Sequence, residues 1–253
     1  MRLSKIVLFT VALCTGAAAS AQKGSGFIEV DGGVALPLGN WGKTSTATSL
    51  MSVNGTISDK NGYANTGGFF SVDGAWFFSK HFGIGGMFKY GTHPLKGVDS
   101  LSQGYEESFD VDTTRTSTTS YKMWSIMPGL YFNLPLVKKL SLTARALAGI
   151  THATTPAITV GIEDGQVNDP PVQQYAASKT AFATDLGVGL KYSIIECIAI
   201  SLRADYFYTK PDFAISNAPR ISNAGREVNS YDEALSSVNF SLGLAYSFGH
   251  KHK

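Results

Sequence analysis

The stretch SVNFSLGLAYSF, residues 237–248, carries an apolar side chain at every second position. Its even positions hold valine, phenylalanine, leucine and tyrosine, whereas its odd positions hold serine, asparagine, glycine and alanine. Side chains of a strand point alternately to opposite faces, so this stretch has one apolar face and one small or polar face. Because about 9 to 11 such residues cross a bilayer, we predict a transmembrane β-strand here, and a helical period fits less well.

Seven further segments show the same alternation. One of them, 140–151, has little bulk on its apolar face, where Ala144, Ala146 and Ala148 alternate. Another, 121–133, contains Pro128, whose missing amide hydrogen predicts a bulge or a local break. The seven segments are 26–38, 68–78, 82–91, 121–133, 140–151, 180–192 and 198–208.

The connections between these eight segments alternate in length. Short connections cover 79–81, 134–139 and 193–197, and long polar ones cover 39–67, 92–120, 152–179 and 209–236. Short periplasmic turns and long extracellular loops are typical of outer-membrane barrels. A soluble barrel such as a lipocalin would instead need an apolar interior. The predicted fold class is therefore all-β: an eight-stranded antiparallel up-and-down transmembrane barrel.

The N-terminal 21 residues have the three parts of a secretory signal peptide. They are the basic residues Arg2 and Lys5, an apolar run over 6–14, and small residues that end at Ala21. We expect cleavage after Ala21, export to the outer membrane, and a barrel domain formed by residues 22–253. An uncleaved anchor is the alternative, although the apolar run is far shorter than the ~20 residues of a spanning helix.

Charge and cysteine content exclude several classes of protein. The chain has 21 Lys and Arg against 19 Asp and Glu, and removal of Arg2 and Lys5 leaves 19 against 19. A neutral chain has no footprint for nucleic acid, and we predict no cofactor and no metal site. Cys197 is the one cysteine that remains after cleavage, so an internal disulfide cannot form.

The non-lipid face of the predicted strands carries charged side chains of both signs. An eight-stranded barrel has an interior only just wide enough for side chains, so these charges should pair and fill the lumen. An ion or proton path is the alternative, and conductance separates the two. The predicted lumen charges are Glu29, Asp31, Asp73, Lys89, Arg145, Asp185, Lys191, Arg203 and Asp205.

Aromatic side chains occur near both ends of the predicted strands. Such residues form girdles at the two membrane interfaces of a barrel. On the short-turn side the expected girdle is Phe78, Phe82, Phe132, Tyr192 and Phe248, and on the long-loop side it is Tyr90, Trp124, Tyr206 and Tyr208, with Trp41 just beyond a strand.

The last predicted strand ends in Phe248, with Tyr246 and Leu244 at alternate positions before it. This ending resembles the C-terminal signal that the barrel-assembly machinery of Gram-negative bacteria recognises, except that five residues, 249–253, follow it. Together with LPLGNW at 36–41 and GVGLKY at 187–192, it makes the chain resemble small porin-like outer-membrane β-barrels similar to outer-membrane proteins A and X. The resemblance covers residues 25–248. It implies outer-membrane lipids, and the assembly machinery during insertion, as partners.

Members of that family are described as structural, adhesive or defensive proteins. The resemblance therefore favours a structural or interaction protein with a filled lumen, whose long loops recognise a surface ligand; a narrow channel is the alternative. A lipid-modifying enzyme is a third reading, because similar barrels resembling lipid A acyltransferases place histidine near the outer rim, where His93 and His152 are expected. No serine or cysteine occupies a nucleophile motif, so the chain is predicted not to be an enzyme.

Overall fold

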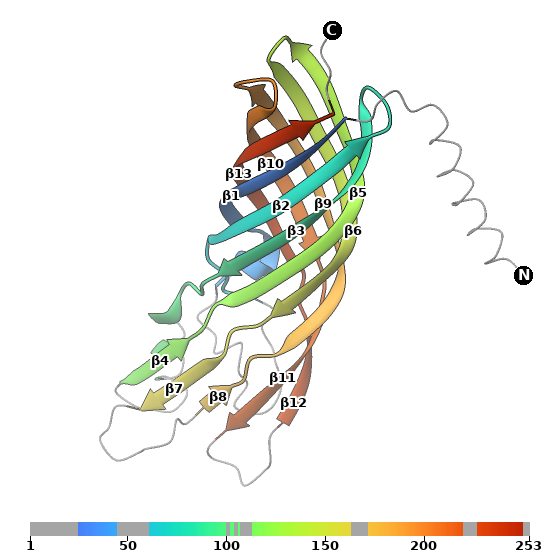
Figure 1. Cartoon of the computed structure of the whole chain (residues 1–253). Coiled ribbons are helices and arrows are strands. Elements are labelled where there is room, and N and C mark those ends of the chain that lie inside the picture. The colour runs from blue at the N-terminus through green and yellow to red at the C-terminus, as the bar shows by residue number, and fades with distance from the viewer. Residues whose placement is uncertain are drawn as a thin grey trace, which may run out of the picture.

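The structure, a computed structural model, describes residues 25–44, 61–99, 102–103, 106, 113–162, 172–219 and 227–249. Eight strands close into a barrel in the order β1-β13-β10-β9-β6-β5-β3-β2 (Figure 1). The predicted fold is confirmed, and the expected signal peptide, 1–21, lies outside the described residues. The barrel strands are β1 (Ser25–Pro37), β2 (Gly67–Phe77), β3 (Phe82–His93), β5 (Tyr121–Val137), β6 (Leu140–Thr154), β9 (Ser178–Ser193), β10 (Ile198–Thr209) and β13 (Leu235–Phe248).

Every neighbouring pair of barrel strands is antiparallel, and β1 closes the barrel by pairing with β13, with Val34 opposite Phe240. The period-two pattern sorts the side chains as the sequence predicts. Leu242 and Leu244 are 63% and 56% exposed on the outer face, whereas Asn239 is fully buried inside. In the described part of the chain, no helix is long and apolar enough to span a membrane.

The ladder from β5 to β6 is interrupted beside Pro128, between Ile126 and Gly129, so the expected local break is confirmed, whereas the alternative, a bulge, is not formed there. β5 continues through Pro128, which pairs with Gly86 of β3 in an unbroken register. The ladder to β6 resumes at Gly129 in the register it had at Ile126, and a register shift occurs further along, between Pro135 and Val137. A missing amide hydrogen removes one ladder bond without adding a residue, so the register can stay unchanged.

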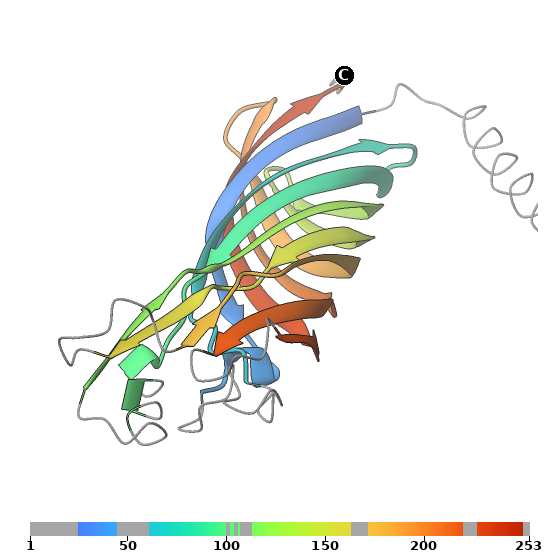
Figure 2. The ribbon, with the colours of Figure 1, turned by 90° about the horizontal axis from the view of Figure 1, so that it is seen from below.

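The sequence predicted that the long connections are polar loops, but the structure shows that they also contain strands. Three of them contribute strands to a second, five-stranded sheet in the order β12-β11-β8-β7-β4, which we call the protruding sheet. This order repeats that of barrel strands β13, β10, β9, β6 and β5, and Figures 1 and 2 show the sheet extending beyond one end of the barrel. Its strands are β4 (Thr114–Thr118), β7 (Ile158–Ile162), β8 (Val172–Gln174), β11 (Asp212–Pro219) and β12 (Glu227–Asp232).

Short breaks separate the protruding sheet from the barrel strands that it continues. Pro156 and Pro211 lie in two of these breaks, where each proline lacks a ladder donor. Threonine hydroxyls replace part of the lost ladder: Thr119 Oγ1 accepts a hydrogen bond from the Ala157 amide at 2.8 Å, and Thr155 Oγ1 accepts one from the Ala177 amide at 2.9 Å. The wall can therefore change direction at the junction between the barrel and the protruding sheet without leaving these backbone groups unpaired.

Candidate functional site

Nine charged side chains fill the middle of the barrel, and we call them the lumen network. The structure places all of the predicted lumen charges inside the wall, and their side chains are at most 14% exposed where ion pairs are formed. Six different strands supply them: β1 (Glu29, Asp31), β2 (Asp73), β3 (Lys89), β6 (Arg145), β9 (Asp185, Lys191) and β10 (Arg203, Asp205).

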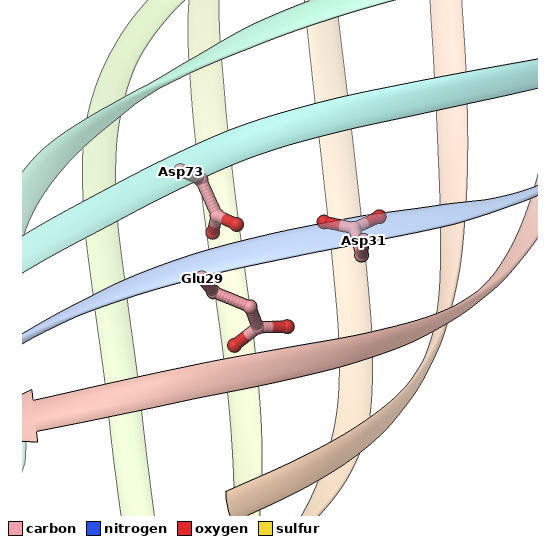
Figure 3. A group of neighbouring side chains, drawn as sticks. All are labelled: Glu29, Asp31 and Asp73. Carbon is pink, nitrogen blue, oxygen red and sulfur yellow. The ribbon is translucent and has the colours of Figure 1, made fainter. Parts of the chain in front are cut away.

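Arg203 lies at the centre of an acidic group. Figure 3 shows Glu29 and Asp31 on β1 and Asp73 on the neighbouring β2. One carboxylate oxygen of each residue lies within 4.8 Å of the others. Such a trio could hold a metal ion, but here the Arg203 guanidinium takes that role. Its Nη1 lies 3.4 Å from Glu29 Oε1 and 3.2 Å from Asp73 Oδ2, and its Nη2 contacts Asp31. The trio therefore binds a cation of the chain itself, and Lys191 and Arg145 add further positive charge beside Glu29 and Asp73.

Arg145 is the second hub of the lumen network. Its Nε lies 3.0 Å from Asp205 Oδ1 and 3.3 Å from Asp185 Oδ1, and its Nη1 lies 3.3 Å from Asp73 Oδ2. Gly187 leaves the space for this arrangement, since a Cβ there would lie 1.8 Å from Asp205 Oδ1. Because Asp73 contacts both arginines, the two hubs form one network.

Lysines flank the two hubs. Lys89 Nζ lies 3.5 Å from Asp185 Oδ2 and over the rings of Phe69 and Phe207, whereas Lys191 Nζ lies 3.1 Å from Glu29 Oε2. Charges in a low-dielectric interior are tolerated only when paired and hydrogen-bonded. The lumen network thus places paired charged side chains inside the barrel, and separating these pairs would be costly.

Aromatic residues close the long-loop end of the bore. Trp41, Tyr63, His93 and Tyr121, which we call the mouth cap, are each at most 1% exposed. The Trp41 ring lies 4.4 Å from His93 and 5.8 Å from Tyr121, measured between ring centroids. The expectation that Trp41 joins the outer girdle is wrong. It lies in the 3-10 helix η1 (Gly39–Gly42), which turns it into the mouth instead of along the wall.

Hydrogen bonds anchor this cap to the segment that precedes β2. Tyr121 Oη donates to the Gly62 carbonyl at 3.0 Å, and His93 Nδ1 lies 3.0 Å from the Asn65 carbonyl. Tyr63 has a positive φ of 54°, an unusual conformation for a side chain of this size. A backbone turn over the mouth thus adds a second obstruction beyond the lumen network.

The family follows from this architecture and from sequence comparison. The sequence model of the family described as outer membrane protein beta-barrel domain matches residues 6–248. The chain belongs to this family. Its barrel is of the Gram-negative outer-membrane type, which indicates an outer-membrane location for this member of the family.

Solved structures of other outer-membrane proteins are similar to this chain at low sequence identity, and no curated protein matches the chain. A major outer membrane protein of Thermus thermophilus has 11% identity and a TM-score of 0.50, covering 88% of this chain and 99% of that one. OprG of Pseudomonas aeruginosa has 11% identity and a TM-score of 0.49, covering 90% and 97%. Ail of Yersinia pestis has 16% identity and a TM-score of 0.44, covering 90% and 100%.

The nine aromatic residues expected at the membrane interfaces all lie on the outer wall of the barrel. Tyr90, Trp124 and Phe132 are half-buried among neighbours, and Phe132 packs on Phe82 with 5.2 Å between ring centroids. The others are between 38% and 51% exposed: Phe78, Phe82, Tyr192, Tyr206, Tyr208 and Phe248.

The two histidines considered for catalysis face opposite sides of the wall. His93 is buried in the mouth cap, whereas His152 stacks on Trp124 outside the barrel, with ring centroids 5.6 Å apart, and its Nδ1 lies 3.0 Å from Thr180 Oγ1. The two rings therefore do not converge on one reacting centre.

Proposed function

We propose that this outer-membrane barrel is a non-conducting interaction protein that holds the protruding sheet above the membrane as its binding surface. One observation carries the proposal: five adjacent barrel strands continue into an ordered sheet, while the bore beneath is filled by the lumen network and the mouth cap. Binding residues are commonly presented by connecting segments on a rigid scaffold.

The described part of the protruding sheet has one packed face and one solvated face. Ile158, Val160 and Phe213 are fully buried, whereas Arg115 and Asp212 are exposed. This is the arrangement of an antiparallel sheet that faces water on one side. At its junction with the barrel, Lys210 Nζ lies 2.6 Å from Asp232 Oδ2, and this hydrogen bond raises the pKa of Lys210 above its ordinary value. The solvated face is the surface that we assign to recognition.

Removal of four of the five strands of the protruding sheet, all except β4, tests this role. Residues 158–174 and 212–232 would each be replaced by an Asn-Gly turn, with Lys138→Gln and Lys139→Gln at the opposite end as the control variant. We expect both proteins to keep the heat-modifiable gel mobility of a folded barrel. Adhesion of producing cells to epithelial cells and to envelope lipids should fall for the deletion alone. Unchanged adhesion and unchanged envelope phenotypes would refute the proposal.

A narrow channel is the main alternative, and conductance decides it. We expect no single-channel steps from the purified protein in planar bilayers, because a permeating ion would have to separate the ion pairs of Arg145 and Arg203. A large, reproducible conductance would overturn the non-conducting part of the proposal.

An enzymatic role has less support, since His93 and His152 do not converge. We propose that His93→Ala and His152→Ala leave the lipid A composition of producing cells unchanged. Loss of a modified lipid species in either variant, at equal protein level, would instead identify an enzyme.

Export and insertion complete the proposal. We propose that the signal peptide is removed after Ala21, so that the mature protein begins at Gln22, which N-terminal sequencing of outer-membrane material tests. The outer-wall aromatics would contact lipid at the two interfaces. Phe248 would be read by the barrel-assembly machinery, so Phe248→Ala should lower the amount of assembled barrel, and an unchanged amount would argue against this partner.

A further inference from the structure

A cavity of about 340 Å³ opens at the short-turn end of the barrel, and we call it the vestibule. It is lined by residues of seven barrel strands and of all three short turns, and its inner end is formed by Glu29, Arg145 and Arg203 of the lumen network. A second cavity, of about 20 Å³ beside Lys89 and His93, has room for roughly one water molecule. The vestibule is at the lower end of the size range of small-molecule sites, ~300 to 1,000 Å³.

Basic side chains outnumber acidic ones around the vestibule. Glu29 is paired with Lys191 and Arg203, and Glu196 on the β9–β10 turn is the other acid among the lining residues. Among the described residues, the three lysines of the turns form no ion pair, so they contribute uncompensated positive charge at the opening. A concave site lined by one sign of charge concentrates ligands of the opposite sign. The basic lining residues are Lys80, Lys138, Lys139, Arg145, Lys191 and Arg203.

Arg145 supplies an independent observation at the inner end. The residue is 5% exposed and lines the vestibule, and its Nη2 has no hydrogen-bond partner in the described part of the chain. Its Nε and Nη1 are already taken by carboxylates. A buried guanidinium nitrogen without an acceptor is costly, and an anionic acceptor gives the strongest hydrogen bond to it.

Aromatic rings form part of the wall between the opening and Arg145. Phe27 and Tyr131 meet edge to face with 5.8 Å between ring centroids, and Phe77 lies beside Phe27 at 6.2 Å. Phe27 and Tyr131 are themselves buried, and Lys191 Nζ lies 3.7 Å from the centroid of the Phe27 ring, so the apolar surface that they offer is small and lies beside a cation. The vestibule thus combines a positive opening, a partly apolar wall and, at its inner end, two arginines that each have a buried nitrogen without a hydrogen-bond partner, Arg145 Nη2 and Arg203 Nε.

We propose that the vestibule binds a small organic anion from the periplasmic side: a carboxylate attached to an apolar body of about two fused rings. The apolar body packs beside Phe27 and Tyr131, and a small shift of the Arg145 side chain lets its buried Nη2 donate a hydrogen bond to the carboxylate. The turn lysines attract the anion and raise its affinity. This site is independent of the surface recognition proposed for the protruding sheet, which lies at the other end of the barrel.

Naphthalene-2-carboxylate is a suitable probe, with naphthalene-2-carboxamide as its uncharged analogue and inorganic phosphate as an anion without an apolar body. Binding to the full barrel in lipid nanodiscs would be measured by equilibrium dialysis, with empty nanodiscs subtracted. We expect saturable binding of the carboxylate at one site, and binding of the carboxamide and of phosphate at least about tenfold weaker.

Two variants and one control locate the probe. Lys80→Gln, Lys138→Gln and Lys139→Gln together should weaken binding about tenfold, since several unpaired charges near the anion are lost. The control replaces three exposed lysines away from the vestibule, Lys43, Lys122 and Lys179, by glutamine, with the same change in net charge. It should keep the affinity of the unmodified protein.

Thr143→Trp should fill the vestibule and abolish binding, because Thr143 lines the cavity. If that variant does not fold, the lysine triple variant decides the matter by itself. Equal affinity in the lysine triple variant, an equal loss in the control, or phosphate bound as tightly as the carboxylate would each overturn the proposal. The last result would mean simple ion exchange on the turn lysines.

Discussion

Replacement of Arg203 by methionine should strongly destabilise the barrel, and the contacts show which carboxylate is responsible. Without Arg203, Asp73 and Asp205 keep Arg145 at 3.3 and 3.0 Å, and Glu29 keeps Lys191 at 3.1 Å. Asp31 keeps only the Ser71 hydroxyl, at 2.7 Å, among the contacts formed by the described residues. Removal of one partner of a buried ion pair costs about 3 to 5 kcal/mol, and we expect a loss of this size in the free energy of unfolding.

A second substitution should identify Asp31 as the source of the loss. Arg203→Met with Asp31→Asn removes the stranded charge while the asparagine can still bond to Ser71, so it should recover at least half of the lost stability. Arg203→Met with Asp73→Asn should recover less, because Asp73 is still paired with Arg145. Arg115→Met on the exposed part of β4 is the matched control and should change stability by less than about 0.5 kcal/mol.

The assay is equilibrium urea unfolding in phospholipid vesicles, followed by tryptophan fluorescence and by the gel mobility of unheated samples. The reasoning is refuted if Arg203→Met lies within about 1 kcal/mol of the unmodified protein. It is also refuted if Asp73→Asn rescues as well as Asp31→Asn. The first result would mean that water replaces the guanidinium at little cost. The second would mean that stability depends only on the net charge of the lumen and not on which residues are paired.

Three further substitutions test other parts of the barrel. Trp41→Ala should lower the free energy of unfolding by about 3 to 5 kcal/mol, because it empties a fully buried site, and urea unfolding measures this loss. The same variant should show no conductance in planar bilayers, since the lumen network remains. Gly33→Ala should cost about 1 to 3 kcal/mol in the same unfolding assay, because a Cβ there would lie 1.9 Å from the Phe240 carbonyl, whereas Gly32→Ala, with 3.5 Å to its nearest atom, should be tolerated. Arg145→Ala should lower the melting temperature measured by gel mobility, again without conductance, and a large conductance would contradict the obstruction by the remaining network.

The barrel wall could be predicted from the sequence because the information is local. The alternation of side chains within each strand identifies its two faces, and a register shift of one residue would move every side chain to the opposite face. The same alternation assigns residues such as Asp185 and Arg203 to the inner face, since charges cannot face lipid at mid-membrane. Neither prediction needs knowledge of which strand pairs with which.

The partners inside the lumen depend on closure of the barrel. Lys191 and Glu29 are far apart along the chain and meet because closure of the barrel brings β9 to the third position from β1, so that the inward side chains of the two strands reach one another. Trp41 follows a strand whose outer face is apolar, so its position in the sequence favours the girdle. Its burial in the mouth arises because η1 and the segment before β2 fold over the opening. The alternation of side chains in the sequence gives no sign of this fold.

By itself, the sequence determined a transmembrane barrel of eight strands, the two faces of its wall and the short and long ends. Tertiary structure alone decided the ion-pair partners, the mouth cap, the vestibule and the protruding sheet. β8 has only three residues, too few for a period-two pattern, and the alternation in β7 (Ile158, Val160) and β11 (Phe213, Ile215) covers too few residues to indicate a strand partner. These strands are held by pairing with strands from other connections. A face can be read from one segment of chain, whereas a pairing exists only once distant segments have been brought together.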